Sequence, residues 1–233
     1  MFSQPFVLTD LSVLQGIGLG VAGTYVNNSG ITTLTTTNSL LASYKTTGQQ
    51  SMFSYRSDNS TTFNNATIAE GIERRLVPQG YWYYGPVYLM GEYVRETQQV
   101  FRQVSAKLGE AATLNNSAWQ IQGGVFLTGE KEAYDAASPN HPVTQGGIGA
   151  WELVARYHTL RYDEAAFAGG ANSFANPATS VRNAHARGIG LNWYLTHIFK
   201  VQLDHEQTRF DGGATVGNRP DQRVITSQFS MIF

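Results

Sequence analysis

The chain has no cysteine among its 233 residues. Disulfide frameworks, thiolate metal sites and cysteine nucleophiles are therefore excluded together. Charge is scarce as well: Asp, Glu, Lys and Arg make up 14% of the residues, against about 25% in an ordinary globular protein. The formal net charge is -1, so no basic field points to nucleic acid as a partner.

Long apolar runs are also missing. No stretch approaches the roughly 18 consecutive apolar residues of a membrane helix, so a chain that spans a membrane must do so with strands. The opening MFSQPFVLTD lacks a basic start followed by an apolar core, and no secretory signal peptide is visible. The 5 histidines lack metal-ligand spacing and no GxSxG motif occurs. We expect no enzyme activity, no metal site and no cofactor.

What the chain does contain is a repeated alternation of apolar and polar residues. In AWQIQGGVFLTGE, Trp119, Ile121 and Val125 alternate with Gln120 and Gln122. A period of two predicts β-strands with one apolar and one polar face. The same pattern occurs in GIGLGVAGTYV, WELVARYHTLRY, RGIGLNWYL, IFKVQLDHEQTRF and RVITSQFSMIF.

The connections between these strands differ in length. RRLVPQGYWYYGPVYLMGEYVRETQQV predicts a hairpin with its turn at Gly85-Pro86, and Thr196-His197 predicts a second tight turn. Long polar loops such as DGGATVGNRPD lie between other strands. We count about nine strands, and QSMFSYR is one of them. The segment ITTLTTTNSLLASYK is a weak candidate for a further strand. Strands of about ten alternating residues, with short turns at one rim and long loops at the other, predict an antiparallel transmembrane β-barrel.

Five segments, taken in order, resemble the C-terminal half of the phosphate-selective porin O and P family. They are YYGPVYLMGEYV, AWQIQGGVFLTGEKEAY, GAWELVARY, GIGLNWYLTHIFKVQLDHEQTRFDGG and RVITSQFSMIF, and the resemblance covers most of residues 11–233. It implies a sixteen-stranded, trimeric outer-membrane barrel that passes anions. In that family the amino-terminal half supplies the other strands and an inward-folding loop that narrows the pore and carries a central lysine. We therefore expect residues 1–233 to be the C-terminal portion of a single barrel domain, with those strands and the signal peptide missing.

The resemblance also implies inward basic residues along the path of the solute. Alternation places Arg75 and Arg156 on the lumen face, with Lys200 near the short-turn rim. Two interpretations are open for these residues: guidance of anions, or ion pairing with lumen carboxylates such as Glu152 that stiffens the wall. Three further carboxylates share this polar face and oppose a strong anion preference: Glu92, Asp204 and Glu206.

Aromatic residues give two more expectations. Tyr81 and Tyr83 either line the permeation path or belong to an aromatic girdle at the membrane interface. Phe233, Met231 and Phe229 end the chain in an alternating apolar pattern. The resemblance implies that they form the signal for the outer-membrane barrel-assembly machinery, and they also suit a role as lipid-facing anchors.

These observations predict a passive channel in the bacterial outer membrane of a Gram-negative cell. Small hydrophilic solutes are expected to pass, with anions and in particular phosphate or polyphosphate as candidates. The expected partners are outer-membrane lipid, the barrel-assembly machinery and further copies in a homotrimer, with no nucleic acid. Two alternatives remain: a general porin without phosphate preference, and a soluble β-sandwich binding module whose apolar face is a core.

Overall fold

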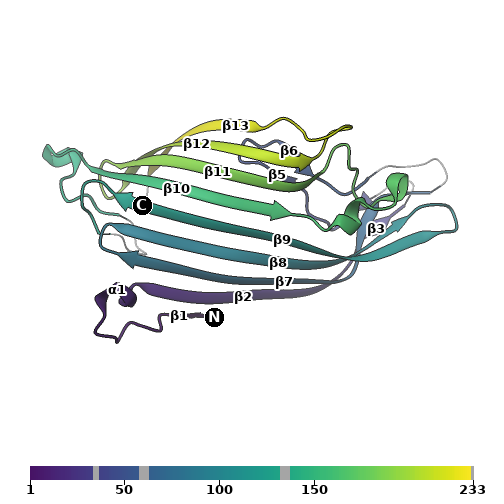
Figure 1. Ribbon diagram of the computed structural model, residues 1–233, viewed down its shortest axis with the longest axis horizontal. Helices are drawn as coiled ribbons and strands as arrows, with labels where there is room; N and C mark the ends of the chain where they lie inside the picture. Colours follow the sequence, from purple (N-terminus) through teal and green to yellow (C-terminus); the bar gives the residue numbers. More distant parts are fainter. Residues whose placement is uncertain (34–36, 58–62, 132–136, 232–233) are drawn as a thin grey trace.

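The computed structural model describes residues 1–33, 37–57, 63–131 and 137–231. Its main feature is one antiparallel sheet of nine strands in the order β1-β2-β7-β8-β9-β10-β11-β12-β13 (Figure 1). These strands are β1 (Phe2–Ser3), β2 (Ile17–Ser29), β7 (Thr67–Tyr84), β8 (Val87–Gln103), β9 (Gly109–Phe126), β10 (Ala150–Arg161), β11 (Val181–Tyr194), β12 (Phe199–Gly212) and β13 (Gln222–Met231). The predicted all-β class is confirmed.

The remaining elements are short. Two two-stranded sheets pair β3 (Ile31–Thr32) with β4 (Thr37–Asn38) and β5 (Tyr44–Lys45) with β6 (Ser51–Phe53). The helical turns are α1 (Ser12–Gln15), η1 (Val143–Gln145), η2 (Glu164–Phe167) and η3 (Gly170–Asn172). Within the described residues, no helix is long and apolar enough to cross a membrane.

Both predicted tight turns are present and have a local cause. Gly85 adopts φ 57°, a left-handed conformation that favours glycine, and with Pro86 it joins β7 to β8. Between β11 and β12, the hydroxyl of Thr196 accepts hydrogen bonds from the backbone N–H groups of Ile198 and Phe199, both at 3.2 Å. Each long strand from β7 onward therefore pairs with its neighbour in sequence.

The connections between strands lie at two rims of the sheet. The prediction that one rim holds only short turns and the other only long loops is partly right. The short-turn rim holds Gly85-Pro86 and residues 195–198, but also the longer connection 127–149. The long-loop rim holds the connections after β2, β10 and β12, but also the tight turn 104–108. Near η1 in this longer connection, Val143 N–H donates to the Leu195 carbonyl at 2.9 Å.

Two segments predicted as possible strands of the large sheet lie elsewhere. QSMFSYR contributes only β6, and ITTLTTTNSLLASYK contributes β3 to β5. The physical reason is that Met52 and Phe53 are adjacent and both buried, which a two-residue period cannot achieve across one sheet. The ninth strand of the sheet is instead the two-residue β1.

The two edges of the sheet, β1 and β13, are not paired with each other, so the described residues do not close a barrel. The expected total of sixteen strands stays a prediction. A β-sandwich needs a second large sheet over the apolar face, and the described part of the chain contains none.

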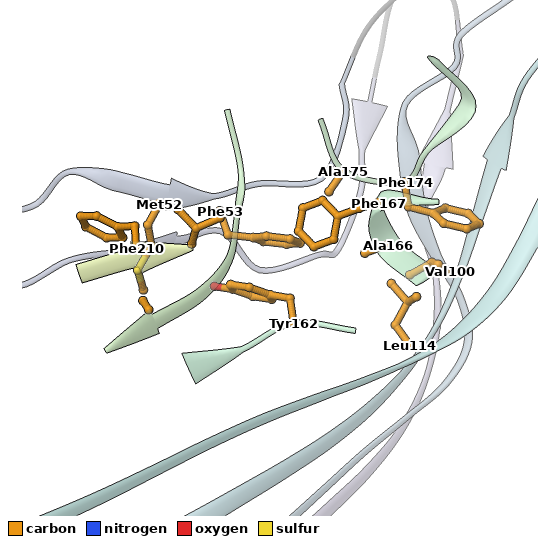
Figure 2. Packing of buried hydrophobic residues seen from close by; sticks show 12 residues of the cluster. Met52, Phe53, Val100, Leu114, Tyr162, Ala166, Phe167, Phe174, Ala175 and Phe210 are labelled. Atoms are coloured by element: carbon orange, nitrogen blue, oxygen red, sulfur yellow. The ribbon is translucent and has the colours of Figure 1, made fainter. Parts of the chain in front are cut away.

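A compact apolar cluster lies near the long-loop rim on one face of the sheet (Figure 2). Phe53 stacks on Tyr162 with ring centroids 3.8 Å apart, and Phe167 meets Phe53 edge-on at 6.1 Å. We call this face of the sheet the inner face and the opposite one the outer face. The outer face is apolar yet exposed: Ile225 is 73% exposed and Phe229 64%. Such a face needs an apolar solvent around it.

Candidate functional site

The polar set of alternating residues lies on the inner face. Glu92, Glu152, Asp204 and Glu206, which were predicted to share a face, all line cavities there. The first cavity has a volume of about 570 Å³ and is bordered by residues from every strand between β7 and β12. The sheet therefore curls around this space.

Residues 37–57, the inward segment, extend over the inner face and reach its far side. The hydroxyl of Thr47 donates a 2.6 Å hydrogen bond to Glu206 Oε1 on β12. Gly48 lies against β13 so closely that an added Cβ would be 2.7 Å from Gln222 Nε2. Nearer its start, the hydroxyl of Tyr44 donates to Glu96 on β8 at 3.3 Å. The inward segment thus narrows the space enclosed by the sheet.

The far end of the inward segment is anchored by the apolar cluster. Phe53 stacks on Tyr162, and the Ser54 backbone N–H donates to Ser180 Oγ at 3.2 Å while that hydroxyl donates back to the Ser54 carbonyl at 2.9 Å. Burial raises the pKa of Tyr162 above its ordinary value, so its hydroxyl stays neutral. A neutral, packed anchor holds this end of the segment in one position.

The contact between Thr47 and Glu206 lies at the boundary of two cavities. Both residues line the first cavity and also the second, which has a volume of about 480 Å³. Lys45 and Arg75 line the first cavity, and Arg156 lines the second. The tip of the inward segment therefore separates two compartments along the inner face.

Arg75 and Arg156, the two predicted lumen arginines, both point to the inner face and both make ion pairs. Arg75 Nη2 is 2.7 Å from Glu73 and 2.8 Å from Glu96. Arg156 Nη2 is 2.7 Å from Glu206. Of the two interpretations of Arg75 and Arg156, ion pairing with carboxylates of the wall agrees with the geometry of both residues.

Glu206 also gathers other donors. His158 Nε2 lies 3.2 Å from Glu206 Oε2, the oxygen that Arg156 contacts. The Thr47 hydroxyl donates to the other oxygen, Oε1. This carboxylate is thus the point at which β10, β12 and the inward segment meet.

Glu152 was proposed as a partner of the arginines, but its partners are neutral. It accepts hydrogen bonds from Asn192 Nδ2 at 2.8 Å and from the Tyr194 hydroxyl at 2.9 Å. Lys200 places its ammonium 4.8 Å from the centre of the Tyr194 ring, a cation–π distance. Glu152 and Lys200 both line the second cavity near the short-turn rim.

Tyr81 and Tyr83 lie on the inner face near the short-turn rim, with ring centroids 4.8 Å apart. Tyr83 lines the second cavity. Tyr81 stacks on Phe2 at 5.3 Å and accepts a hydrogen bond from Gln4 Nε2 at 2.9 Å. An aromatic girdle on the outer face at this rim comes from other residues, in the stacked pairs Trp82–Tyr84, Trp151–Trp193 and Phe199–Phe229. The position of the two tyrosines favours the wall of the path over the girdle.

The terminal residues divide between described and undescribed positions. Phe229 and Met231 lie on the outer face of β13 and are exposed. Phe229 stacks on Phe199 of β12 with ring centroids 5.7 Å apart. Phe233 lies outside the described residues. An apolar outer face on the last strand suits both interpretations of these residues.

Sequence reasoning missed the inward segment and two of its functional candidates. Lys45 and Thr47 line the first cavity from this segment, not from a strand of the large sheet. One signal was present in the sequence: the adjacent apolar residues Met52 and Phe53 interrupt the alternation. Among the described residues, no group of three or more His, Cys, Asp or Glu side chains is placed to hold a metal ion.

Comparison with known proteins gives one family. The family model of phosphate-selective porin O and P matches residues 19–229. The match takes in the large sheet from β2 to β13 and the inward segment. No curated protein matches the chain.

Proposed function

The chain belongs to the phosphate-selective porin O and P family and is a protein of the bacterial outer membrane; on this premise we propose that its inner face lines a water-filled path through which small hydrophilic solutes, phosphate-type anions among them, diffuse passively. Polar side chains on one face and apolar side chains on the other suit strands that separate water from lipid. The function requires no chemical step.

The observation that carries the proposal is the position of Lys45. This lysine lines the first cavity from the inward segment, and within the described residues it makes no ion pair. Arg75 and Arg156 differ, because a carboxylate lies within 2.8 Å of each. A cation that makes no ion pair attracts anions from solution in a narrow space. We assign to Lys45 the first contact with a passing anion.

The paired arginines have a second task in this proposal. A guanidinium group has five donors in a planar fork, and its ion pair occupies only some of them. Arg75 borders the first cavity and Arg156 the second, so the two arginines stand on either side of the Thr47–Glu206 contact. An oxyanion that leaves Lys45 meets Arg75 and then Arg156, with Lys200 beyond them, and the tyrosines near the short-turn rim line the last part of the path.

The charge balance favours a second candidate function, a general porin without phosphate preference. The first cavity is lined by Lys45 and Arg75 against three carboxylates, Glu92, Glu96 and Glu206. The second is lined by Arg156 and Lys200 against Glu152, Asp204 and Glu206. A wall with more carboxylates than basic groups weakens selection for anions. The two candidates differ in whether phosphate occupies the path long enough to block other ions.

Assembly forms part of the proposal. The open edges at β1 and β13 must be paired in a membrane, because unpaired backbone groups are costly in lipid. We propose that further amino-terminal strands complete a sixteen-stranded barrel and that three barrels form a homotrimer. Phe229, Met231 and Phe233 serve as the recognition signal for the barrel-assembly machinery.

The experiment is single-channel recording of the refolded chain in a planar phosphatidylcholine bilayer, with chloride as the carrier and stepwise addition of phosphate. Discrete current steps that phosphate blocks, and that lose this block in Lys45→Gln, support an oxyanion path. Lys107→Gln is the matched control, since Lys107 is an exposed lysine in the tight turn 104–108. Steps that ignore phosphate support the general porin, and an absence of steps shows that this chain does not conduct without further strands.

A further inference from the structure

A second set of charges lies on the outer face, away from the proposed path. Six exposed arginines share the alternation of the outward apolar residues, such as Leu76, Tyr93 and Ile225. One occurs on each of β7, β8, β10, β11, β12 and β13. We call them the arginine belt: Arg74, Arg95, Arg161, Arg187, Arg209 and Arg223.

The belt occupies one band across the sheet, four residues deep (11 minus 7). Counted from the short-turn end of its own strand, each arginine is between 7 residues (Arg187 to Tyr194, 194 minus 187) and 11 residues (Arg161 to Ala150, 161 minus 150) away. Strands rise about 3.3 Å per residue and tilt by about 40° in membrane barrels, so a span of about nine residues covers roughly 23 Å along the membrane normal. That distance matches an apolar band of about 25 Å.

The outer face between the two rims therefore has three zones. At the short-turn rim lie the stacked aromatic pairs that form a girdle. Exposed apolar side chains such as Ile121, Ile189 and Leu203 follow. The arginine belt comes next, toward the long-loop rim. Exposed aromatic residues accompany the belt too, with Trp119 and Tyr157 5.3 Å apart beside Tyr93. Aromatic residues thus lie at both boundaries and the arginines at one, which makes the two membrane interfaces chemically different.

Few of these arginines are neutralised by the protein itself. Within the described residues, Arg95 and Arg223 make no ion pair. Arg74 lies 5.4 Å from the centre of the Tyr25 ring, and Arg187 donates to the neutral Gln207 Oε1 at 2.7 Å.

The other two belt arginines have only exposed partners. Arg161 is 3.9 Å from Glu164 and Arg209 is 3.4 Å from Asp221. Such exposed pairs are weak. By contrast, the inner-face arginines reach carboxylates that are 10% exposed or less. The belt thus keeps its positive charge available to a partner outside the protein.

We propose that the arginine belt binds the phosphorylated headgroups of anionic lipids, and that the long-loop rim lies in the leaflet that presents them. Guanidinium groups bind phosphate oxygens in pairs, with a geometry that an ammonium group lacks. Basic residues at a membrane surface strengthen binding of anionic lipids by about fivefold each at low salt. Six of them in one band fix both the depth and the orientation of the sheet in the membrane. The proposal concerns the outer face alone and does not require that the inner face conduct ions.

The test is a native mass-spectrometry titration of the refolded chain in a neutral detergent. The probes are phosphatidic acid and diacylglycerol with the same acyl chains, which differ only in the phosphate. Arg95→Gln/Arg223→Gln removes two belt charges that have no carboxylate partner among the described residues. Lys107→Gln/Lys131→Gln removes the same charge from two exposed residues in connections off the belt. Circular dichroism and heat-dependent gel mobility establish that each variant is folded.

We expect the unaltered chain to bind phosphatidic acid more tightly than diacylglycerol. The arginine pair variant should lose about 25-fold in affinity for phosphatidic acid, from two arginines at about fivefold each, while the lysine pair variant keeps it. Excess inorganic phosphate should not displace the lipid, because the acyl chains hold it against the apolar band. Equal affinity in the arginine variant, an equal loss in the lysine variant, or displacement by free phosphate overturns the proposal.

A second variant covers the case in which the glutamine substitutions prevent folding. Arg95→Lys/Arg223→Lys keeps both charges and removes only the planar fork. A loss of phosphatidic acid affinity that is smaller than that of the glutamine pair is expected. Unchanged affinity contradicts recognition of phosphate by guanidinium groups.

Discussion

Release of the inward segment is the most informative perturbation, because one hydrogen bond connects its tip to the sheet wall. Thr47→Val replaces the hydroxyl by a methyl group of similar size and removes the 2.6 Å hydrogen bond to Glu206. Glu206 keeps Arg156 and His158 as partners, so the carboxylate is not left alone. The substitution therefore tests the tether and not the burial of a charge.

The expected magnitude follows from the type of bond. A hydrogen bond to a charged group contributes about 1.5–3 kcal/mol. Thr47 is exposed, and water screens the bond, so the lower value of about 1.5 kcal/mol applies. That free energy corresponds to roughly a tenfold change in the ratio of tethered to released tips.

Hydrogen exchange followed by mass spectrometry measures this ratio directly. The tip contains two backbone hydrogen bonds, from Thr46 N–H to the Gln50 carbonyl and from Gln49 N–H to the Thr46 carbonyl, both at 2.9 Å. Their exchange should become about tenfold faster in Thr47→Val, while β10 to β12 exchange as before. Thr179→Val is the control, because it removes an exposed threonine hydroxyl in the connection after β10.

Two results would refute this reasoning. Unchanged exchange at the tip would mean that the Thr47–Glu206 bond contributes nothing to the position of the inward segment. Faster exchange spread equally over the strands would mean that the substitution loosens the whole sheet.

Three further predictions test the faces, the anchor and the path. Leu203→Arg should block assembly into vesicles, since a charge in the apolar band costs about 2–4 kcal/mol, whereas Gln202→Arg on the inner face should assemble; equal assembly contradicts the assigned faces. Phe53→Ala should cost about 3–5 kcal/mol of local stability, seen as proteolysis within the inward segment with an intact sheet, and general proteolysis would argue against a separate anchor. Lys45→Gln should lower the ratio of chloride to potassium permeability in bilayer recordings, and an unchanged ratio removes Lys45 from the path.

Most of the large sheet was predictable because its cause is local. Strands such as β9 alternate strictly, with Trp119 and Ile121 outward against Gln120 and Gln122 inward, and alternation depends only on neighbouring residues. The turn at Gly85-Pro86 was predictable for the same reason, since glycine at a positive φ is a local requirement. The resemblance to the porin family then added what local patterns do not contain.

The inward segment was not predictable because its stability comes from distant partners. Phe53 packs on Tyr162, and Thr47 reaches Glu206, across more than a hundred residues of sequence. The same holds for the ion pairs: alternation placed Arg156 and Glu152 on one face, but only the register between strands decides that Arg156 meets Glu206 instead. Register between strands depends on the whole sheet.

The central claim is that the inner face meets water and the outer face meets lipid, and alternating single thiols test it most directly. The chain has no cysteine, so each introduced cysteine is the sole thiol. Adjacent pairs on two strands serve: Gln202→Cys with Leu203→Cys, and Thr226→Cys with Ile225→Cys. In outer membranes, a membrane-impermeant maleimide should label positions 202 and 226 and leave 203 and 225 unlabelled. Equal labelling within each pair, or labelling of the outer positions alone, would contradict the account.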